Sequence, residues 1–338
     1  ASKSFLGKPI RLLRKQNPFH PAKPKRICLE LTNYCNLNCP FCLVGQQNIK
    51  GSQSHNELIR EKGMMDLELA KKSIVEAKQF GINEVMLAFQ GEGLLYDRKD
   101  FVELIKQTKK VGLKALLFTN GLLLDPHYST EIVRAGLDLM QFSVDGTTQE
   151  VYELNRAGGK FEKVFQNMKD MVQIVEREES GLKLKWQFIV MRNNEHQIEE
   201  AKELAKQIGI TLVLKTFAES KPEWATHNPK YRRKLSSIVW CSDIYTAIYV
   251  YWNGDVVSCC YDLEGNEIVG NAKINTIAEV WNGEKYRLLR KRINQSFVNP
   301  GNRPEFCTNC LKYTSIKKSK INIAMSRIKY NLLQPFLK

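Results

Sequence analysis

Between residues 26 and 216 the chain alternates short apolar runs with helical stretches, and this pattern constrains the fold more than any other feature. Six runs rich in aliphatic, β-branched and aromatic residues are separated by five stretches with helical periodicity. Such alternation predicts a parallel sheet whose strands are joined by right-handed helical crossovers. The predicted strands are 26–32, 84–89, 114–118, 137–143, 183–190 and 211–216, and the predicted helices are 66–80, 99–111, 127–135, 161–178 and 195–208.

The number of strand–helix units narrows the architecture. Six units are too few for a complete eight-stranded barrel. They predict an α/β fold in the form of an open, partial (β/α)6 TIM-like barrel, with a doubly wound sheet as the alternative. In both architectures ligands bind at the carboxyl ends of the strands, so the loops at those ends are where functional residues are expected.

From about residue 217 the pattern changes, which predicts a second, smaller α+β region. A linker-like stretch precedes a predicted β-hairpin formed by 247–252 and 255–258, with Asn253-Gly254 as a type I′ turn. A helix over 276–293 follows. The predicted parts are a basic arm (1–25), the partial barrel (26–216), the small α+β domain (217–315) and a basic amphipathic tail (316–338).

The net charge of +15 belongs to the two ends of the chain. Residues 1–26 contain eight Lys or Arg and residues 311–338 contain seven, without any acidic residue, so the remainder is neutral overall. Both segments also contain aliphatic residues. Three interpretations remain: packing on the body with the lysines in water, contact with an anionic membrane surface, or binding of nucleic acid. Nucleic acid ranks last because no RNA-binding signature is present.

The cysteine content indicates the compartment. No run of 18 apolar residues occurs, and the first 26 residues lack the apolar core of a secretory signal. Nine cysteines in such a chain indicate metal ligands in a reducing compartment rather than a disulfide framework. We therefore expect a cytoplasmic protein, with peripheral contact at the inner membrane surface as the alternative that the basic ends suggest.

Three cysteines, Cys35, Cys39 and Cys42, lie within eight residues directly after the first predicted strand. Three thiolates can hold three irons of a [4Fe–4S] cluster and leave the fourth iron open to a substrate or cofactor. The alternatives are a structural zinc site, which needs a fourth ligand such as His55, and buried reduced thiols. Cys28 lies inside the first strand and is predicted to be a core cysteine.

A second group of cysteines lies in the smaller region. Cys241, Cys259, Cys307 and Cys310 supply four thiolates, and Gly254 tightens the hairpin that returns Cys259 toward Cys241. Four thiolates can close around a zinc ion or a [4Fe–4S] cluster. Spacing alone favours zinc, whereas an open iron–sulfur cluster elsewhere in the chain favours iron.

The first motif, Cys-x3-Cys-x2-Cys with Phe41 before its third cysteine, resembles the signature of the radical S-adenosylmethionine (SAM) superfamily. Over about residues 26–216, motifs after successive strands are similar to the SAM-binding positions of that family. Gln90-Gly91-Glu92 resembles its Gly-Gly-Glu motif, with Gln in place of the first Gly, and a carboxylate suits the SAM ammonium. The resemblance implies SAM contacts from Phe41, Gln90, Gly91, Glu92, Asn120, Ser143, Asp145, Arg156 and Met191.

The second motif, Cys241-x12-Gly254-x4-Cys259 with Cys307-x2-Cys310, resembles the SPASM/twitch extension of radical SAM enzymes. No cysteine follows Cys310, which favours the shorter twitch form. The resemblance implies one auxiliary [4Fe–4S] cluster held by these four cysteines. Cys260 then replaces Cys259 as a ligand, is a bystander, or donates a hydrogen atom to a substrate radical.

The resemblance also implies the reaction class. An electron from a flavodoxin- or ferredoxin-type donor would cleave SAM to a 5′-deoxyadenosyl radical, which abstracts a hydrogen atom from the substrate. We expect oxidation or epimerisation of a polar small molecule, such as a sugar or cyclitol, anionic if phosphorylated or lipid-linked.

Two alternatives to a small-molecule enzyme remain. One is modification of a ribosomal peptide by a crosslink, thioether or epimerisation. It is less favoured because only about 25 residues precede the first strand, too few for a leader-binding module. The other is a non-catalytic metal-binding adaptor, which predicts zinc and no SAM cleavage.

Overall fold

The computed structural model describes most of the chain between the two basic ends. The predicted arm and tail lie largely or wholly outside the described residues, as does His55. Among the described helices, none combines the length and the apolar composition needed to cross a bilayer. The described residues are 23–46, 60–217, 222–232, 241, 243–296, 303–307 and 310.

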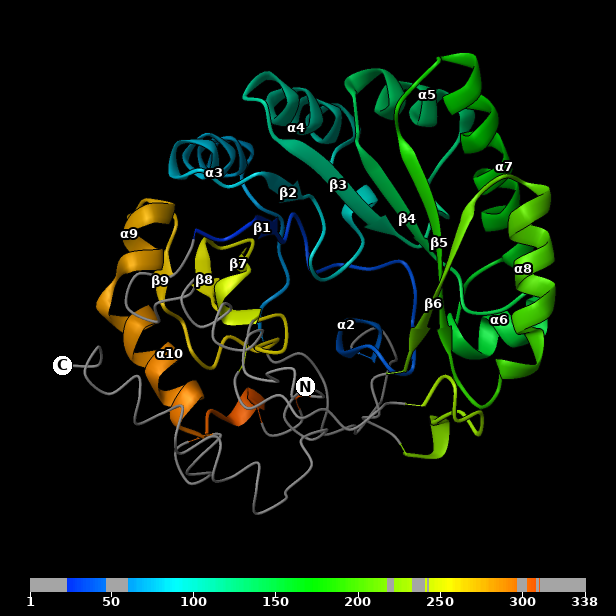
Figure 1. Cartoon of the computed structure of the whole chain (residues 1–338). Coiled ribbons are helices and arrows are strands. Elements are labelled where there is room, and N and C mark those ends of the chain that lie inside the picture. The colour runs from blue at the N-terminus through cyan, green and yellow to red at the C-terminus, as the bar shows by residue number, and fades with distance from the viewer. Residues whose placement is uncertain are drawn as a thin grey trace, which may run out of the picture.

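A nine-stranded sheet forms the centre of the molecule, in the order β6-β5-β4-β3-β2-β1-β7-β8-β9 (Figure 1). Its first six strands are parallel, and each corresponds to a strand predicted from the sequence. They are β1 (Arg26–Leu29), β2 (Glu84–Met86), β3 (Lys114–Thr119), β4 (Leu139–Ser143), β5 (Lys183–Val190) and β6 (Thr211–Thr216).

Helices that connect these strands cover the outer face of the curved sheet (Figure 1). Asp66, Asp97 and Asp125 cap three of them, because each carboxylate accepts a backbone N–H of the first turn. The short α6, capped by Thr148, was not predicted. The helices are α3 (Leu67–Phe80), α4 (Arg98–Lys110), α5 (Pro126–Ala135), α6 (Gln149–Asn155), α7 (Phe161–Arg177) and α8 (Ile198–Gln207).

The two faces of the sheet differ in what they bury. Side chains that alternate along the strands, such as Leu29 and Phe142, pack with the helices in the main core. On the opposite, inner face, a separate cluster contains Cys28 and Met86, with Phe118 packed against it. Cys28 is 3 % exposed, as expected for a core cysteine.

The smaller region continues the same sheet. β7 (Ala247–Val250) pairs in parallel with β1, and β8 (Asp255–Val257) and β9 (Gly270–Asn271) follow in antiparallel order. The predicted helix over 276–293 is two helices, α9 (Ile277–Asn282) and α10 (Glu284–Ser296), because Gly283 adopts an extended conformation between them. Lys72 of α3 donates to the Ala272 carbonyl (2.8 Å), which fixes this region to the barrel helices.

The turn between β7 and β8 is not the predicted type I′ turn. That turn needs positive φ at both central residues, but among the described non-glycine residues φ is positive at Glu179 alone. Gly254 adopts the left-handed conformation, with a φ of +93°, and its N–H donates to the Tyr251 carbonyl (2.9 Å). The Asn253 side chain accepts from the Asp255 N–H (3.1 Å), which favours a three-residue loop with a left-handed glycine.

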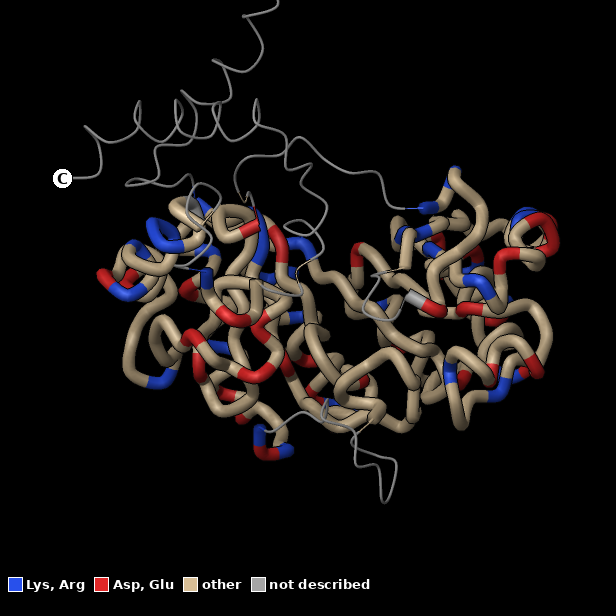
Figure 2. Tube along the Cα trace, turned by 90° about the horizontal axis from the view of Figure 1, so that it is seen from below, with Lys and Arg blue, Asp and Glu red and all other residues tan. Residues whose placement is uncertain are grey.

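Charged side chains are distributed over the periphery of the described structure. Figure 2 shows Lys and Arg interspersed with Asp and Glu on the outer elements. This distribution agrees with a body that is neutral overall and keeps its large charge excess in the terminal segments.

The hairpin glycine gives a test of the turn. A Cβ on Gly254 would lie 2.8 Å from Asn271 Oδ1 in a backbone conformation that L-residues rarely adopt. We expect Gly254→Ala to lower the free energy of unfolding by about 1–3 kcal/mol in denaturant titrations. Gly181→Ala is the matched control, because its added methyl group would have no heavy atom within 4 Å and its φ is not positive. Equal losses in both variants would contradict the assignment.

Candidate active site at the carboxyl edge of the sheet

The loops that follow β1 to β5 meet at the carboxyl edge of the sheet, as the parallel topology predicts. Each carries at least one residue predicted to be functional. These residues are Cys35, Cys39 and Cys42 after β1, Gln90, Gly91 and Glu92 after β2, Asn120 after β3, Ser143 and Asp145 at and after the end of β4, and Met191 after β5.

The cysteine loop after β1 is held by backbone contacts. The Cys42 N–H donates to the Cys39 carbonyl (3.1 Å), and α2 (Leu43–Gln46) begins directly afterwards. Gly45 of this helix packs so closely that a Cβ would lie 2.5 Å from the Cys39 nitrogen. The Asn38 N–H donates to the Ala157 carbonyl (2.9 Å), which fastens the loop to the segment after α6.

The three thiols of this loop form no disulfide and lie close enough to affect one another's ionisation. Burial raises the pKa of Cys35 to about 12, and Glu92 and the thiols of Cys39 and Cys42 add to the shift. Among the described residues no three His, Cys, Asp or Glu side chains meet at the distance of single-ion ligands. A [4Fe–4S] cluster instead takes each thiolate on a separate iron. Three neighbouring thiols therefore fit the open cluster as a donor set.

Glu92 is fixed by hydrogen bonds from the next strand. Its Oε1 accepts from Thr119 Oγ1 (2.7 Å), and its Oε2 accepts from the Asn120 N–H (2.8 Å). Burial raises its pKa, with these donors opposing the shift. The carboxylate thus has a defined orientation at the end of β3, where a cation would find a preorganised acceptor.

Gly91 brings the loop after β2 against the segment that leads to the cysteines. Its φ is +69°, and a Cβ would lie 2.4 Å from the Thr32 carbonyl oxygen and 2.6 Å from that of Tyr34. Only glycine fits this close approach. Asn120 adds a second contact, because its Nδ2 donates to Asn36 Oδ1 (2.8 Å).

Asp145 and Arg156 form a buried ion pair beside the cysteine loop. Arg156 Nε and Nη2 lie 2.7 and 2.6 Å from Asp145 Oδ2, and the Ile189 N–H donates to Oδ1 (2.6 Å). The remaining Nη1 lies 3.9 Å from Cys39 Sγ, and the guanidinium lies 5.2 Å from the Phe41 ring centroid. Both Asp145 oxygens are therefore occupied, and this geometry gives Asp145 the role of orienting Arg156.

Three aromatic side chains pack together at the cysteine loop after β1. Phe41 packs edge-on against Phe217 (6.0 Å) and Trp224 (6.1 Å), two residues that the sequence had not indicated. Met191 is fully buried directly after β5, and Ser143 is half-buried at the end of β4. The rings supply an apolar wall at an otherwise polar edge.

The four cysteines of the smaller region also lie near one another. Burial raises the pKa of Cys241 to about 11 and that of Cys307 to about 12, and the Cys310 thiol adds to both shifts. Cys260, burial and Cys241 together raise the pKa of Cys259. The Cys310 N–H donates to the Cys307 carbonyl (3.3 Å). Four neighbouring thiols that form no disulfide fit the ligand set of a closed cluster.

Cys260 points toward a different environment from the other cysteines of this group. Cys259 and Tyr249 lie close enough to lower the pKa of its thiol, and Cys28 lies close enough for its own pKa to be raised by Cys260. Tyr249 packs near Phe89 on the inner face of the sheet (4.7 Å). The structure thus connects Cys260 to the inner face, and its role in catalysis stays a prediction.

Sequence reasoning missed the residues that connect the two cysteine groups. Arg60 and Tyr251 lie between the loops, and neither belongs to a motif. One signal was available, because Glu30 is a charged residue at the end of an apolar strand and such a residue needs a buried partner.

Comparison with known families identifies this arrangement. The radical SAM superfamily profile matches residues 29–208, and the SPASM profile, described as an iron–sulfur cluster-binding domain, matches residues 241–311. The chain therefore belongs to the radical SAM superfamily and carries a C-terminal SPASM iron–sulfur domain. SAM and [4Fe–4S] clusters are its cofactors, as the sequence predicted.

Two relatives illustrate the range of activities in this family. The chain is 25 % identical over 334 residues to the tungsten-containing aldehyde ferredoxin oxidoreductase cofactor-modifying protein of Pyrococcus furiosus, covering 85 % of this chain and 87 % of that protein. It is 31 % identical over 189 residues to the PqqA peptide cyclase of Gluconobacter oxydans, covering 56 % of this chain and 48 % of the cyclase.

Solved structures confirm the architecture. SuiB of Streptococcus suis bound to its precursor peptide SuiA gives a TM-score of 0.64 at 16 % identity, over 94 % of this chain and 78 % of that chain. BtrN in complex with AdoMet and 2-DOIA gives 0.55 at 16 % identity, over 89 % and 98 %. These similarities show the fold, so the predicted partial barrel with an auxiliary iron–sulfur extension is confirmed.

The Asp145–Arg156 pair supplies a stability test. Asp145→Asn leaves the buried guanidinium without its charge partner, so we expect the free energy of unfolding to fall by about 3–5 kcal/mol in denaturant titrations. Glu178→Gln is the control, because its partner Arg134 is exposed, so a much smaller loss is expected. A loss at Asp145 no larger than at Glu178 would show that the pair does not support this edge.

Proposed function

We propose that this chain uses SAM to remove a hydrogen atom from a C–H bond of a polar small molecule, leading to its oxidation or epimerisation. One observation carries the proposal: the three-cysteine loop, the Glu92 carboxylate and the Arg156 guanidinium meet at one edge of the sheet. This edge is where ligands bind in parallel α/β barrels.

The residues present suit the two kinds of cofactor. In this proposal Cys35, Cys39 and Cys42 hold the SAM-binding cluster, and Cys241, Cys259, Cys307 and Cys310 hold the auxiliary one. When bound, SAM and its cluster supply one-electron cleavage to methionine and a 5′-deoxyadenosyl radical, with the electron coming from a flavodoxin- or ferredoxin-type donor.

The side chains around the loop orient the bound SAM. Glu92 would accept from its ammonium, and Arg156, held by Asp145, would face its carboxylate. Phe41 and Met191 would flank the adenine, and the rings of Phe217 and Trp224 would exclude water from that side. Gly91, Gln90, Asn120 and Ser143 complete the contacts at the strand ends.

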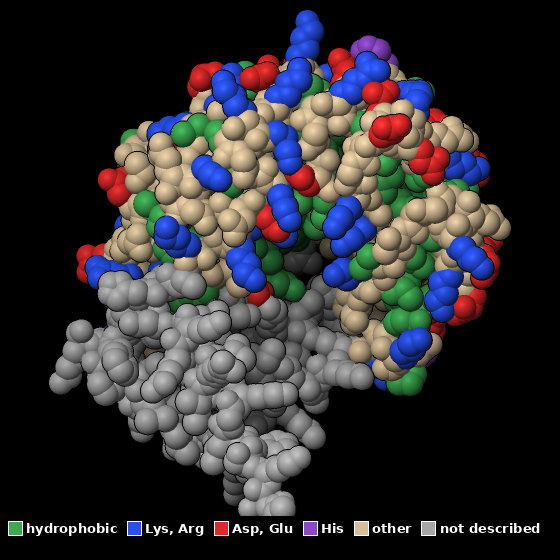
Figure 3. All heavy atoms as spheres, turned by 45° about the horizontal axis from the view of Figure 1, so that its top comes forward, with side chains coloured by type: hydrophobic (Ala, Val, Ile, Leu, Met, Phe, Trp, Pro, Cys, Tyr) green, Lys and Arg blue, Asp and Glu red, His purple; other side chains and the backbone are tan. Residues whose placement is uncertain are grey.

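The inner face of the sheet supports a polar, anionic substrate. Gln141 and Gln187 form an amide pair on this face (2.9 Å), and Lys185 lies beside Gln141 in the strand register. Figure 3 brings the top of Figure 1 forward and shows a hollow with Lys and Arg side chains around its rim, on the side where the strands begin rather than at their carboxyl edge. The name of the Pyrococcus relative describes modification of a cofactor, which supports a small-molecule substrate. The similarity to that relative extends over most of this chain.

A second candidate is modification of a peptide. β6 is an edge strand that pairs with β5 and has exposed residues at both ends, and an extended peptide can add to such an edge. The names of the PqqA peptide cyclase and of the SuiB–SuiA complex support this candidate. Comparing 5′-deoxyadenosine formation with phosphorylated or aminated sugars and with candidate precursor peptides distinguishes the two.

Cluster content tests the proposal directly. After oxygen-free purification and reconstitution we expect about eight irons per chain, and 5′-deoxyadenosine on addition of SAM and dithionite. Cys39→Ser should lose about four irons and all SAM cleavage, whereas Cys307→Ser should lose about four irons and retain cleavage. Cys28→Ser is the control and should retain both. Zinc in place of iron, with no cleavage, would overturn the proposal.

Cys260→Ala tests the hydrogen-atom donor role. If Cys260 returns a hydrogen atom to the substrate radical, the variant should keep about eight irons and SAM cleavage but lose formation of the inverted product. Chiral chromatography of the product measures this. Unchanged turnover with unchanged product stereochemistry would remove the donor role, and loss of about four irons would assign Cys260 as a ligand.

A further inference from the structure

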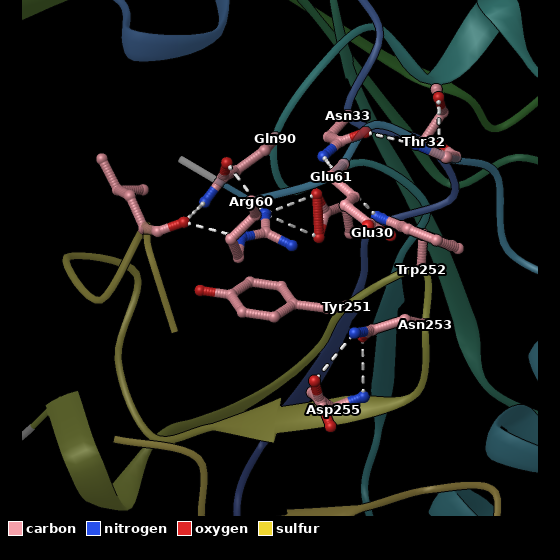
Figure 4. Close-up of polar contacts among 12 residues, drawn as sticks. Glu30, Thr32, Asn33, Arg60, Glu61, Gln90, Tyr251, Trp252, Asn253 and Asp255 are labelled. Carbon is pink, nitrogen blue, oxygen red and sulfur yellow. Dashed lines mark hydrogen bonds and ion pairs between the residues drawn. The ribbon is translucent and has the colours of Figure 1, made fainter. Parts of the chain in front are cut away.

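A buried polar cluster centred on Arg60 lies between the two halves of the site (Figure 4). Arg60 Nη2 donates to both oxygens of Glu30 (2.8 and 3.1 Å), which lies directly after β1. Its Nε donates to the Leu263 carbonyl (2.9 Å), four residues after Cys259. One guanidinium therefore bonds to the end of the first strand and to the loop that follows β8.

Gln90 closes this connection from the SAM-binding side. Its Oε1 accepts from Arg60 Nη2 (3.3 Å), and its Nε2 donates to the same Leu263 carbonyl (3.3 Å). Gln90 immediately precedes Gly91 and Glu92. The loop after β2 is thus joined to the Cys259–Cys260 loop by two side chains that share one acceptor.

The loop that Arg60 contacts, Cys259–Glu267, is held by hydrogen bonds of its own. The guanidinium lies 3.6 Å from the centroid of the Tyr251 ring, and the Tyr251 hydroxyl donates to the Asp262 carbonyl. The Asp262 carboxylate accepts from the N–H groups of Asn266 (2.8 Å) and Glu267 (3.0 Å). Arg60 therefore contacts a loop whose backbone is itself held by several hydrogen bonds.

The backbone that carries Arg60 is held on both sides. Asn33 accepts from the Gly63 N–H (2.8 Å) and donates to the Glu61 carbonyl (2.8 Å). Trp252, in the β7–β8 turn, donates to the same Glu61 carbonyl (3.1 Å). The segment around Arg60 is thereby bonded to Asn33, which precedes the first cysteine loop, and to the β7–β8 hairpin.

The geometry requires arginine. Glu30 is fully buried, so its charge needs a partner that also satisfies its oxygens. Only the planar guanidinium fork can bind a carboxylate, a carbonyl and an amide oxygen at once while stacking on an aromatic ring. A lysine keeps the charge but presents a single nitrogen, so it cannot make the same set of contacts.

We propose that Arg60 is a positioning residue that couples the Gln90–Glu92 loop to the Cys259–Glu267 loop, so that SAM bound at the first loop stabilises the second. This inference rests on the proposed function for the identity of the ligand. Coupling of this kind is a free energy between two sites and can be measured without turnover.

Hydrogen exchange of the whole chain, reconstituted with both clusters, tests the coupling. Adding SAM without reductant should slow amide exchange locally at 89–94. It should also slow exchange remotely at 259–267, by about five-fold or more, the lower end of typical coupling. In Arg60→Lys the local protection should remain and the remote protection should disappear.

Two further variants make the test specific. Gln90→Leu removes the bridge but leaves the Arg60–Glu30 pair, so it should also lose the remote protection, even if Arg60→Lys fails to fold. Because Gln90 also lies in the SAM-binding loop, local protection at 89–94 in this variant must first show that SAM still binds. Arg26→Lys is the matched control, because Arg26 pairs with Glu84 at the opposite end of β1 (2.7 Å), and this variant should retain the remote protection.

Two results overturn the coupling. One is remote protection that persists in Gln90→Leu. The other is an unaltered protein in which SAM clearly protects 89–94 but does not protect 259–267. No SAM effect at either loop overturns the SAM site itself and the coupling with it.

Discussion

Parallel hydrogen bonding of β1 to both β2 and β7 is the interaction on which the rest of the structure depends. Along β1, Arg26 stands opposite Glu84 on one side and Ala247 on the other, and Cys28 stands between Met86 and Tyr249. The barrel and the SPASM region are therefore parts of one sheet. Because the first cysteine loop follows β1 and Cys259 follows β8, the separation of these two loops is set by strand spacing and register rather than by a flexible linker.

Buried charges are concentrated at the edge where the cofactors are expected. Asp145 with Arg156 and Glu30 with Arg60 are ion pairs whose carboxylates are fully buried, and Glu92 is held by neutral donors. Removing such groups from water costs more than an apolar core of the same volume would. A protein selected for stability alone would have little reason to place them together, so their clustering marks the part of the fold that serves chemistry.

Much of this architecture follows from local sequence patterns, and the exceptions have physical causes. The six parallel strands were predictable because each is a short apolar run between helices. The first cluster site, Cys35 to Cys42, was predictable because its ligands are close together in the sequence. The pairing of β7 with β1 was not predictable, since periodicity identifies a strand but not its neighbour. Arg60 was missed because its partners, Glu30 and Leu263, are 30 and 203 positions away. The Asn253-Gly254 turn was assigned wrongly because side-chain bonds to Asp255 override the usual preference of that dipeptide.

The pairing of β7 with β1 also has a consequence during synthesis. The paired residues Arg26 and Ala247 are separated by roughly 220 positions. At a synthesis rate of about 5–20 residues per second, one edge of β1 waits roughly ten to forty seconds for its partner. During that interval the first cysteine loop already exists and the auxiliary hairpin does not. The nascent chain thus presents an open strand edge, and such an edge is prone to association with other chains.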